Sequence, residues 1–422
     1  MRRGEYTLIG RRAGGFVVSI AIVCAIFTSC FGGPKPIKVG ILHSFSGPLA
    51  SSEKAVAEAS MLAIEELNAA GGLIGRPLEV VVADGQSDPK VFAAEAKRLI
   101  REEDVAVIFG CWTSASRKEV RPVVESNDVL LFYPVQYEGL ESSPAIVYTG
   151  STPNQQILPA VDWAIEQFGP RLFVVGSDYV FPRAAAAVLA DHVASTGGEI
   201  LGEKFVPLGS MEVDDLVLAM LDARPDVVVN LINGDTNTAF FSALEDHGVA
   251  AVTLPVLSFS IAEEEARSIG TGLLAGHYAA WTYFQSIPSD ANAAFVAAYR
   301  DRYGSDRVTD DPIEAAYFGV HLWAQTVESI GTVETASVRA RVRGLQFSAP
   351  GGPVLVDPQN LHTWKTCRIG RFLANGQLEI VWESERPIAP RPYPVSRKKT
   401  DWELFLNDLR ERWGGGWSAA AQ

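Results

Sequence analysis

Short apolar runs of strand character alternate with stretches of helical periodicity from residue 35 onward. The runs 37–42, 78–84 and 105–109 are typical of strands. Helical patterns fill the intervals, one ending at Gly71-Gly72 and the next covering 92–100. A strand–helix–strand–helix–strand order predicts a parallel sheet with helices on both faces. Right-handed crossovers then place the loops that follow the strands along one edge of the sheet.

The alternation begins again near residue 170, and a chain of 422 residues is too long for one hydrophobic core. We therefore predict an α/β protein of two similar Rossmann-like lobes, each with a parallel sheet. The later strands are expected at 172–176, 199–205, 226–232 and 276–281, and the later helices at 184–196, 214–223, 293–303 and 312–330. Alternation around Asn375-Gly376 predicts a β-hairpin within 354–384.

The N-terminal region is typical of a targeting segment. Four arginines within residues 1–12 precede an apolar run at 16–27, which is shorter than the ~20 residues that a spanning helix needs. The run closes with Phe27-Thr28-Ser29-Cys30, which is similar to the cleavage motif of lipoproteins. We predict a lipoprotein-type signal peptide at 1–29, lipidation of Cys30 and a tether at 30–36. The protein would then be exported, and either anchored to the cell membrane by lipid or periplasmic. Plain secretory cleavage, an uncleaved anchor and the choice between Sec and Tat export stay open.

The acidic balance of the chain argues against nucleic-acid binding. The net charge is −14, and loss of residues 1–29 with their four arginines and one glutamate takes it to −17, which repels phosphate backbones. Once Cys24 leaves with the signal peptide and Cys30 is lipidated, Cys111 and Cys367 remain. Both lie in apolar stretches and are expected to be free, buried thiols, with a disulfide between them as the alternative that stays open. The sequence carries no metal-binding motif.

Common enzyme motifs are missing from the sequence. It contains no Gly-x-x-x-x-Gly-Lys-Ser/Thr, Gly-x-Ser-x-Gly or His-Glu-x-x-His pattern. The glycine-rich stretch 71–75 follows a helix and precedes a strand, the reverse of the order in a dinucleotide-binding loop. We therefore predict a protein that is not an enzyme and uses no cofactor.

Three loops that follow expected strands carry the most specific motifs. They are Gly110-Cys111-Trp112-Thr113-Ser114-Ala115-Ser116-Arg117-Lys118, Phe132-Tyr133-Pro134-Val135-Gln136-Tyr137-Glu138-Gly139 and Val175-Gly176-Ser177-Asp178-Tyr179-Val180-Phe181-Pro182-Arg183. With these motifs the chain resembles type I periplasmic binding proteins over about 37–394, in the branch of urea and short-chain amide receptors. Amide-sensing regulators of that branch usually carry Tyr at the position of Trp112 and Thr-Pro at that of Val135-Gln136. Both departures favour a urea receptor.

The resemblance implies two lobes joined by three crossovers, with ligand held between them when the hinge closes. Lobe 1 would comprise 37–151 plus 285–346, lobe 2 would comprise 152–284 plus 347–410, and 411–422 would form a flexible tail. The implied partners are a small neutral ligand (urea or a short amide), ABC permease subunits with their ATPases, and the membrane that holds the lipid anchor.

The chemistry of urea sets what a specific pocket must contain. Urea is flat and neutral, with four N–H donors around its edge and one carbonyl acceptor, so its pocket needs in-plane acceptors, a donor and aromatic faces. Ser114 is the firmest candidate, because it is a small hydroxyl directly after a strand. The full set of candidate ligand-binding residues is Trp112, Thr113, Ser114, Tyr133, Gln136, Tyr137, Glu138, Asp178, Tyr179 and Asp235.

Structural roles compete with these assignments. Trp112 and Tyr179 are also suited to packing. Asp178 is suited to capping the next helix, and Glu138 to a turn. Arg117-Lys118 are expected to be solvated helix charges. Three functional alternatives stay open: a receptor for formamide or acetamide, a cytoplasmic amide-sensing regulator, which would need no export signal, and an amidohydrolase.

Overall fold

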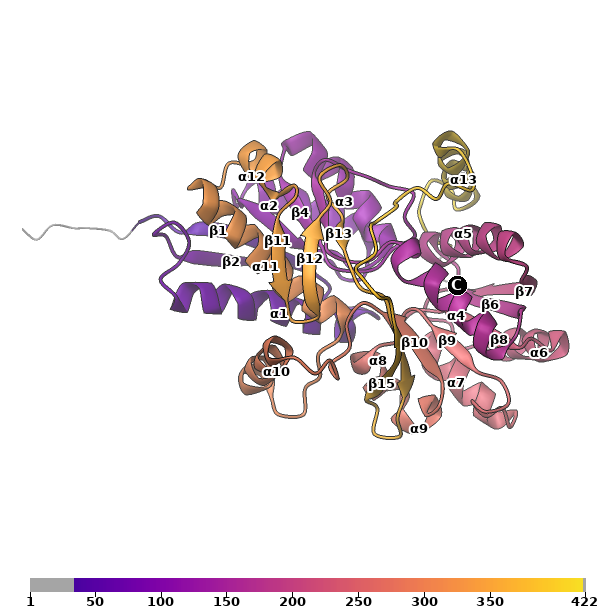
Figure 1. Ribbon diagram of the computed structural model, residues 1–422. Coiled ribbons are helices and arrows are strands. Elements are labelled where there is room, and N and C mark those ends of the chain that lie inside the picture. Colours follow the sequence, from indigo (N-terminus) through magenta and orange to yellow (C-terminus); the bar gives the residue numbers. More distant parts are fainter. Residues whose placement is uncertain (1–33, 420–422) are drawn as a thin grey trace, which may run out of the picture. The chain divides into compact units, whose positions relative to one another are not determined.

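The computed structural model describes residues 34–419, so the expected signal peptide, Cys24 and Cys30 lie outside the described residues. Two large sheets, each flanked by helices, make up most of this part of the chain (Figure 1). We call each of these sheets, with its helices, a lobe. No helix in the described range combines the length and the apolar character needed to cross a bilayer.

The first lobe is built on five parallel strands in the order β2-β1-β3-β4-β5. The strands are β1 (Ile37–His43), β2 (Leu78–Asp84), β3 (Val107–Gly110), β4 (Leu130–Tyr133) and β5 (Ile146–Tyr148), and the helices between them are α1 (Ala50–Ala69), α2 (Pro89–Arg101) and α3 (Ser114–Asn127). Ile37 lies opposite Leu78 at the start of the β1–β2 register. Every residue of β3 and β4 is buried, as expected for strands that are covered on both faces.

Helices from later in the chain complete this lobe. They are α10 (Asp290–Tyr303), α11 (Asp311–Ile330) and α12 (Thr335–Val342). Helix α11 begins after Asp310, whose carboxylate accepts the backbone N–H of Ile313, and ends before Gly331 in the left-handed conformation. Its Trp323 packs edge-on against Phe109 of β3, with ring centroids 5.9 Å apart. The core of the first lobe therefore joins distant segments of the sequence.

The second lobe is built on seven strands in the order β15-β14-β10-β9-β8-β6-β7. The strands are β6 (Arg171–Ser177), β7 (Glu199–Val206), β8 (Val227–Leu231), β9 (Val256–Ser258), β10 (Tyr278–Trp281), β14 (Arg368–Phe372) and β15 (Leu378–Glu383). Strands β6 to β10 run parallel. Strands β14 and β15 form an antiparallel hairpin around Asn375-Gly376, which confirms the hairpin expected there.

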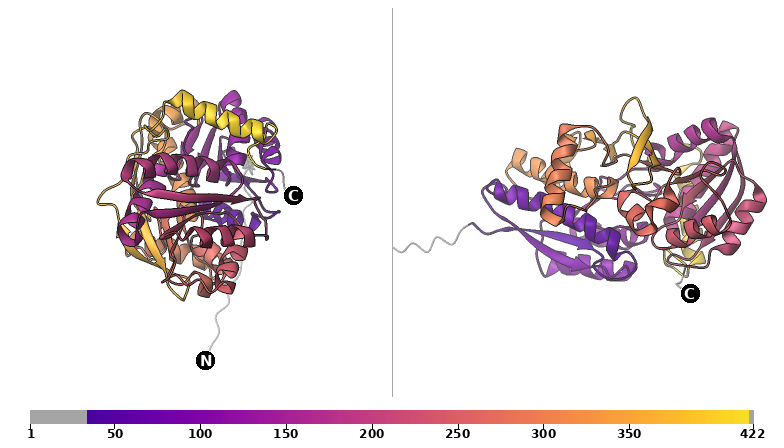
Figure 2. Two further views of the ribbon diagram at one scale, coloured as in Figure 1. Left: turned by 90° about the vertical axis from the view of Figure 1, so that its right-hand side faces the viewer. Right: turned by 90° about the horizontal axis from the view of Figure 1, so that it is seen from below.

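Helices cover the second sheet as well. They are η1 (Pro153–Gln155), α4 (Ile157–Phe168), α5 (Val180–Thr196), α6 (Asp214–Ala223), α7 (Thr236–Asp246), α8 (Glu263–Ile269), α9 (Thr271–Leu274) and α13 (Lys399–Arg412). Figure 2 shows α13, in yellow at the end of the chain. It inserts Trp402 into the core that contains the α5 residues Ala185 and Leu189. The C-terminal helix thus belongs to the second lobe.

The described chain passes between the lobes three times, after β5, after β10 and before β14. This arrangement confirms the predicted α/β class with parallel sheets. The sequence analysis placed the second lobe's last segment from residue 347 onward. In the structure, residues 346–364 instead form a small antiparallel sheet that packs on the first lobe. Its strands are β11 (Gln346–Ala349), β12 (Gly352–Val356) and β13 (Thr363–Trp364). Val354 packs on Phe318 of α11, and Val356 joins the core around β1, so apolar burial holds the segment there.

The end of the chain also differs from the flexible tail expected at 411–422. Helix α13 extends to Arg412. Beyond it, the Trp417 carbonyl and the Ala419 N–H are hydrogen-bonded to the backbone of the loop after β6. Backbone bonds of this kind order the described part of a terminus.

Candidate functional site

Loops at the carboxyl ends of the parallel strands bring polar side chains of both lobes together. In the first lobe these loops follow β1, β3 and β4, and in the second lobe they follow β6, β8 and β9. Side-chain hydrogen bonds join the lobes here. Gln136 donates its Nε2 proton to the Phe259 carbonyl at 3.0 Å, and Ser52 donates its hydroxyl to Glu265 at 2.8 Å. This edge is where ligands bind in open α/β sheets.

Ser114 lies in the first turn of α3, directly after the β3 loop. Thr113 caps the helix, since its side chain accepts the N–H of Ser116 at 3.0 Å. The Ser114 hydroxyl donates to the carboxylate of Glu138 and accepts from Nη1 of Arg117 at 3.1 Å. Two of the sequence candidates, Ser114 and Glu138, are therefore in direct contact, and both are buried.

Arg117 and Lys118 are not solvated, which corrects the expectation from the sequence. The Arg117 guanidinium is fully buried, with Nη2 3.1 Å from Glu138 and Nε 2.9 Å from Glu141. Lys118 lies 3.2 Å from Glu138 and 3.3 Å from Glu141. The physical reason is the β4–β5 loop, which carries both glutamates over α3 and replaces water around the cations. Glu138 is thus an ion-pair partner and not only a turn residue.

Charge around this cluster is balanced. Burial alone would raise the pKa of Glu141, but the charges of Arg117, Lys118 and Arg121 outweigh it and hold that pKa well below its usual range. Burial likewise disfavours the charged form of Arg117, and the two glutamates outweigh that effect and raise the pKa of the guanidinium. Arg117 and Lys118 therefore face Glu138 and Glu141, and the partly exposed Arg121 is shared between Glu141 and Glu125, so the formal charges behind Ser114 nearly cancel.

Aromatic rings pack around the Arg117 guanidinium. Its central carbon lies 4.8 Å from the ring centre of Tyr133 and 4.3 Å from that of Tyr137. The Tyr133 hydroxyl donates to the Trp112 carbonyl at 2.7 Å, so the candidates Trp112 and Tyr133 are held side by side. Trp112 is 9% exposed and contributes to the core of the first lobe.

Tyr137 connects the cluster to the third crossover. Its hydroxyl lies 2.5 Å from Nε2 of His362, and the imidazole stacks on Tyr148 with centroids 4.0 Å apart. Burial lowers the pKa of His362 to about 3, so the ring is neutral. Since Nδ1 lies 2.8 Å from the Asn360 carbonyl, Nδ1 carries the proton and Nε2 accepts from Tyr137.

Tyr179 is the second-lobe candidate that lies closest to this cluster. It is 3% exposed, and its hydroxyl has no hydrogen-bond partner among residues 34–419. Burial raises the pKa of Tyr179 well above its usual value, and the proximity of Tyr133 and Glu138 adds to the shift. The structure thus brings Tyr179 opposite the first-lobe candidates.

The two remaining second-lobe candidates, Asp178 and Asp235, lie outside the buried cluster around Arg117. Asp178 does not cap α5, because its carboxylate pairs with Arg183 at 2.8 Å, and within the described chain no side chain caps that helix. The alternative of a helix cap is therefore wrong. Asp235 is exposed and immediately precedes α7, with no side-chain hydrogen bond to that helix. It lies outside the buried cluster.

Several buried polar atoms at the same edge lack a partner within the described part of the chain. They are His43 Nε2, Glu53 Oε1, Gln136 Oε1, Thr236 Oγ1 and Ser260 Oγ. Only Gln136 was a candidate from the sequence. His43 is the last residue of β1, and its Nδ1 lies 3.3 Å from Oε2 of Glu53. The hydroxyls of Thr236 and Ser260 follow β8 and β9. Gln136 and Thr236 follow strands that the sequence predicts, whereas Ser260 follows the unpredicted β9, His43 lies in β1 and Glu53 lies in α1.

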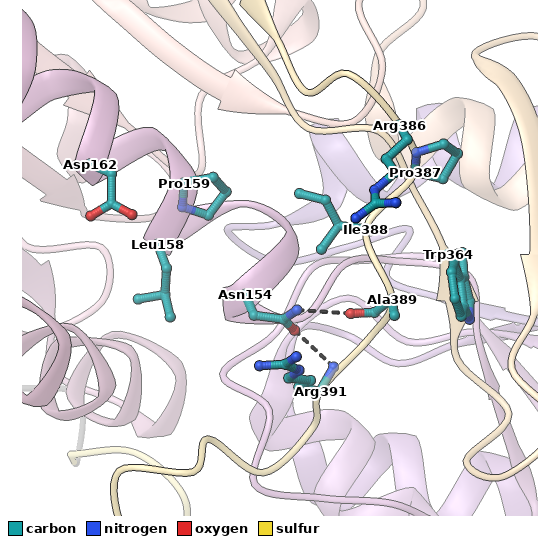
Figure 3. A pocket seen from close by; sticks show the side chains of 10 residues that line it. All are labelled: Asn154, Leu158, Pro159, Asp162, Trp364, Arg386, Pro387, Ile388, Ala389 and Arg391. Carbon is teal, nitrogen blue, oxygen red and sulfur yellow. Dashed lines mark hydrogen bonds between the residues drawn. The ribbon is translucent and has the colours of Figure 1, made fainter.

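A separate groove lies at the crossover segments, away from these residues. Its volume is about 610 Å³. Asn154 holds its floor by donating to the Ala389 carbonyl and accepting from the Arg391 backbone N–H, both at 2.8 Å (Figure 3). The groove is lined by Asn154, Leu158, Pro159, Asp162, Trp364, Arg386, Pro387, Ile388, Ala389 and Arg391. None of the sequence candidates lines it.

Residues 34–419 contain neither a cluster of metal-binding side chains nor a disulfide. No group of three or more histidine, cysteine, aspartate or glutamate side chains is placed there to hold a metal ion. Cys111 and Cys367 are free and buried, which confirms the prediction for both thiols.

Comparison with known proteins identifies the family of the chain. Residues 37–399 match the family model described as "Periplasmic binding protein domain". The chain is 26% identical over 336 residues to "Leu/Ile/Val-binding protein homolog 6" of Brucella melitensis, and the alignment covers 77% of this chain and 85% of that protein.

Solved structures share the fold. A solute binding protein of an ABC transporter from Rhodopseudomonas palustris, in complex with p-hydroxybenzoic acid, is similar with a TM-score of 0.77 and 24% identity, over 86% of this chain and 99% of that one. A leucine binding protein from Thermotoga maritima is similar with a TM-score of 0.70 and 19% identity, over 82% and 98% of the two chains.

Proposed function

The chain belongs to the periplasmic binding protein family, and from this premise we propose that it is the extracytoplasmic substrate-binding component of an ABC importer. In this role it captures a small ligand between its lobes and delivers it to permease subunits driven by their ATPases. It changes no bond in the ligand. Lipid on Cys30 holds the protein at the membrane surface.

We further propose that the ligand is urea or a short amide. The observation that carries this proposal is the balanced charge behind Ser114, where Arg117 and Lys118 are each paired with Glu138 and Glu141. No cation of this cluster is left to hold a ligand carboxylate.

Hydrogen-bonding capacity at the same edge suits an amide. The unpartnered Gln136 Oε1 accepts from a ligand N–H, and the Ser260 and Tyr179 hydroxyls serve a carbonyl or a further N–H. The ring of Trp112, which contributes to the core of the first lobe, supplies an apolar face for a flat molecule.

A carboxylate ligand is the second candidate, and the names of similar proteins favour it. One relative is named for leucine, isoleucine and valine, and one structure with this fold holds p-hydroxybenzoic acid. Such a ligand carries a carboxylate, for which the paired charges behind Ser114 leave no free cation. The two candidates therefore differ in whether the ligand contains a carboxylate.

Isothermal titration calorimetry on protein lacking residues 1–30 decides between an amide ligand and a carboxylate ligand. The panel is urea, formamide, acetamide, leucine and p-hydroxybenzoate. Urea has four heavy atoms, and the best tiny ligands reach about −1.5 kcal/mol per atom, so binding should be near −6 kcal/mol, or tens of micromolar. Acetamide should bind about ten-fold more weakly, because its methyl group leaves a buried acceptor unpaired. Binding of leucine or p-hydroxybenzoate without binding of urea contradicts the proposal.

A further inference from the structure

The described end of the chain pairs with the second-lobe loop of the site. The backbone N–H of Val180 donates to the Trp417 carbonyl at 2.9 Å, and the N–H of Ala419 donates to the Asp178 carbonyl at 3.0 Å. Between these two bonds, Tyr179 and Ser418 face each other as an antiparallel bridge. Tyr179 is thus held on both sides by residues 417–419, which we call the strap.

The same C-terminal region also touches the first-lobe loop of the site. The Trp417 ring lies with its centre 5.0 Å from Nζ of Lys118, the cation that pairs with Glu138 and Glu141. Upstream of α13, the Pro392 carbonyl accepts the N–H of Leu140 at 2.6 Å. The C-terminal region therefore contacts the loops that carry Glu138 and Tyr179.

Helix α5 depends on this contact for its first turn. The first four N–H groups of a helix have no partner inside the helix, and within the described residues no side chain caps α5. The Trp417 carbonyl supplies the partner of Val180. Loss of the strap would leave Val180 N–H and the Asp178 carbonyl unpaired, and would free the peptide units on either side of Tyr179.

We propose that the strap is a positioning element of the ligand site, which fixes the Tyr179 loop before ligand arrives. The proposal rests on the proposed function, in which Tyr179 contacts the ligand. A loop that is already ordered loses less conformational entropy on binding, so the strap raises affinity without touching the ligand. Trp417 and Ala419 are positioning residues in this scheme.

A matched pair of variants at one position tests the strap in the full mature chain. Ala419→Pro removes the N–H that donates to Asp178, whereas Ala419→Ser keeps it. Deletion of 417–422 removes the whole strap. Amide hydrogen exchange of the segment 177–184 and urea calorimetry are measured on all three and on wild type.

Ala419→Pro and the deletion should raise exchange at the start of α5 by about ten-fold or more. Ala419→Pro loses one hydrogen bond and should weaken urea binding by roughly five-fold, and the deletion loses two and should weaken it at least as much. Ala419→Ser should match wild type in both measurements. If the deletion variant has the same exchange rates and the same urea affinity as wild type, the proposal that the strap positions the Tyr179 loop is wrong. Faster exchange with unchanged affinity overturns its role in binding. If wild type binds no compound of the panel, the proposed function fails, while the exchange data still decide whether the strap orders the loop.

Discussion

Arg117 and Glu141 form an ion pair that is closed to solvent, with Nε 2.9 Å from Oε1 and neither side chain exposed. Removing two charges from water is costly, and the cost is offset only where further bonds satisfy both groups. Glu138 satisfies the other end of the guanidinium, and the Tyr148 hydroxyl donates to the same Glu141 oxygen at 2.9 Å. The pair is therefore one part of a network that spans the site loops.

Glu141→Gln should destabilise the protein strongly, because it leaves Arg117 buried with a single carboxylate. Loss of one partner of a buried pair costs about 3–5 kcal/mol. Guanidinium chloride unfolding measures the change. Glu379→Gln breaks the exposed pair with Arg371 and should cost less than about 1 kcal/mol. Equal losses in the two variants would show that the buried pair contributes no more than the exposed one.

The same Glu141→Gln variant should shift ligand preference where it remains folded. The wall behind Ser114 gains one net positive charge, so acetate should bind measurably while urea affinity stays the same or falls. Calorimetry with acetate and urea at low ionic strength compares the variant with wild type. Unchanged rejection of acetate contradicts the view that Glu141 keeps the site neutral.

Tyr179→Phe should weaken urea binding by about ten-fold while the fold is kept. The hydroxyl has no partner among residues 34–419, so its loss removes a ligand hydrogen bond and breaks no internal one, a change of about 1–2 kcal/mol. Tyr278→Phe, in β10 of the same lobe, is the control. Urea calorimetry supplies the affinities and circular dichroism checks the fold. Wild-type affinity in Tyr179→Phe removes this residue from the ligand site.

Stability should fall as the pH rises from about 6.5 to 8, above the range in which the buried, neutral His362 acts in the opposite sense. Burial raises the pKa of Glu263 to about 8, with the neighbouring charges of Glu265 and Asp311 adding to it, and burial raises the pKa of Glu314 to about 7. A folded-state pKa above the unfolded value gives stability that is complete below pH 4.5 and is lost as the pH climbs through 7 and 8.

Glu263→Gln isolates one part of this dependence. The variant cannot ionise at this position, so its unfolding free energy should decline less between about pH 6.5 and 8, by on the order of 2 kcal/mol. Guanidinium chloride unfolding at several pH values measures the slope. Glu411→Gln, on the exposed side of α13, should keep the wild-type slope. If the unfolding free energy of Glu263→Gln changes with pH as steeply as that of wild type, Glu263 is not the source of the pH dependence.

Cys30→Ala should release the protein from membranes. A diacylated cysteine holds a protein firmly, whereas a polypeptide without lipid has no comparable anchor. Fractionation of cells and mass spectrometry of the N-terminal peptide measure the effect. Cys24→Ala, within the predicted signal peptide, is the matched control and should stay in the membrane fraction. A Cys30→Ala protein that remains wholly with membranes excludes this anchor.

Much of the fold could be predicted from local pattern. Strand β2 and helix α6 have the predicted bounds, because their apolar periodicity is unbroken. Strand β9 was not predicted, since three residues, Val256–Ser258, are too few to show alternation. The small sheet β11–β13 was assigned to the wrong lobe, because its packing partner α11 is set by tertiary contacts.

The sequence predicts which loops come together but not how their side chains pair. The candidates after β3, β4 and β6 meet, as the rule for parallel sheets predicts. The pairing of Arg117 with Glu138 and Glu141 crosses more than twenty positions of sequence, and no local pattern reveals it. A charged stretch on a helix is usually solvated, so burial of Arg117 had to be seen in the folded chain.

The two enclosed thiols make the protein convenient for labelling. Burial raises the pKa of Cys111 and of Cys367 well above the usual thiol value, and neither side chain reaches solvent, so thiol-reactive dyes should leave both untouched. In a chain that starts after residue 30, a single cysteine placed at Val252, which is 91% exposed, would be the one reactive handle. A fluorophore there would turn the variant into an optical reporter of its own ligand, without any native cysteine having to be removed.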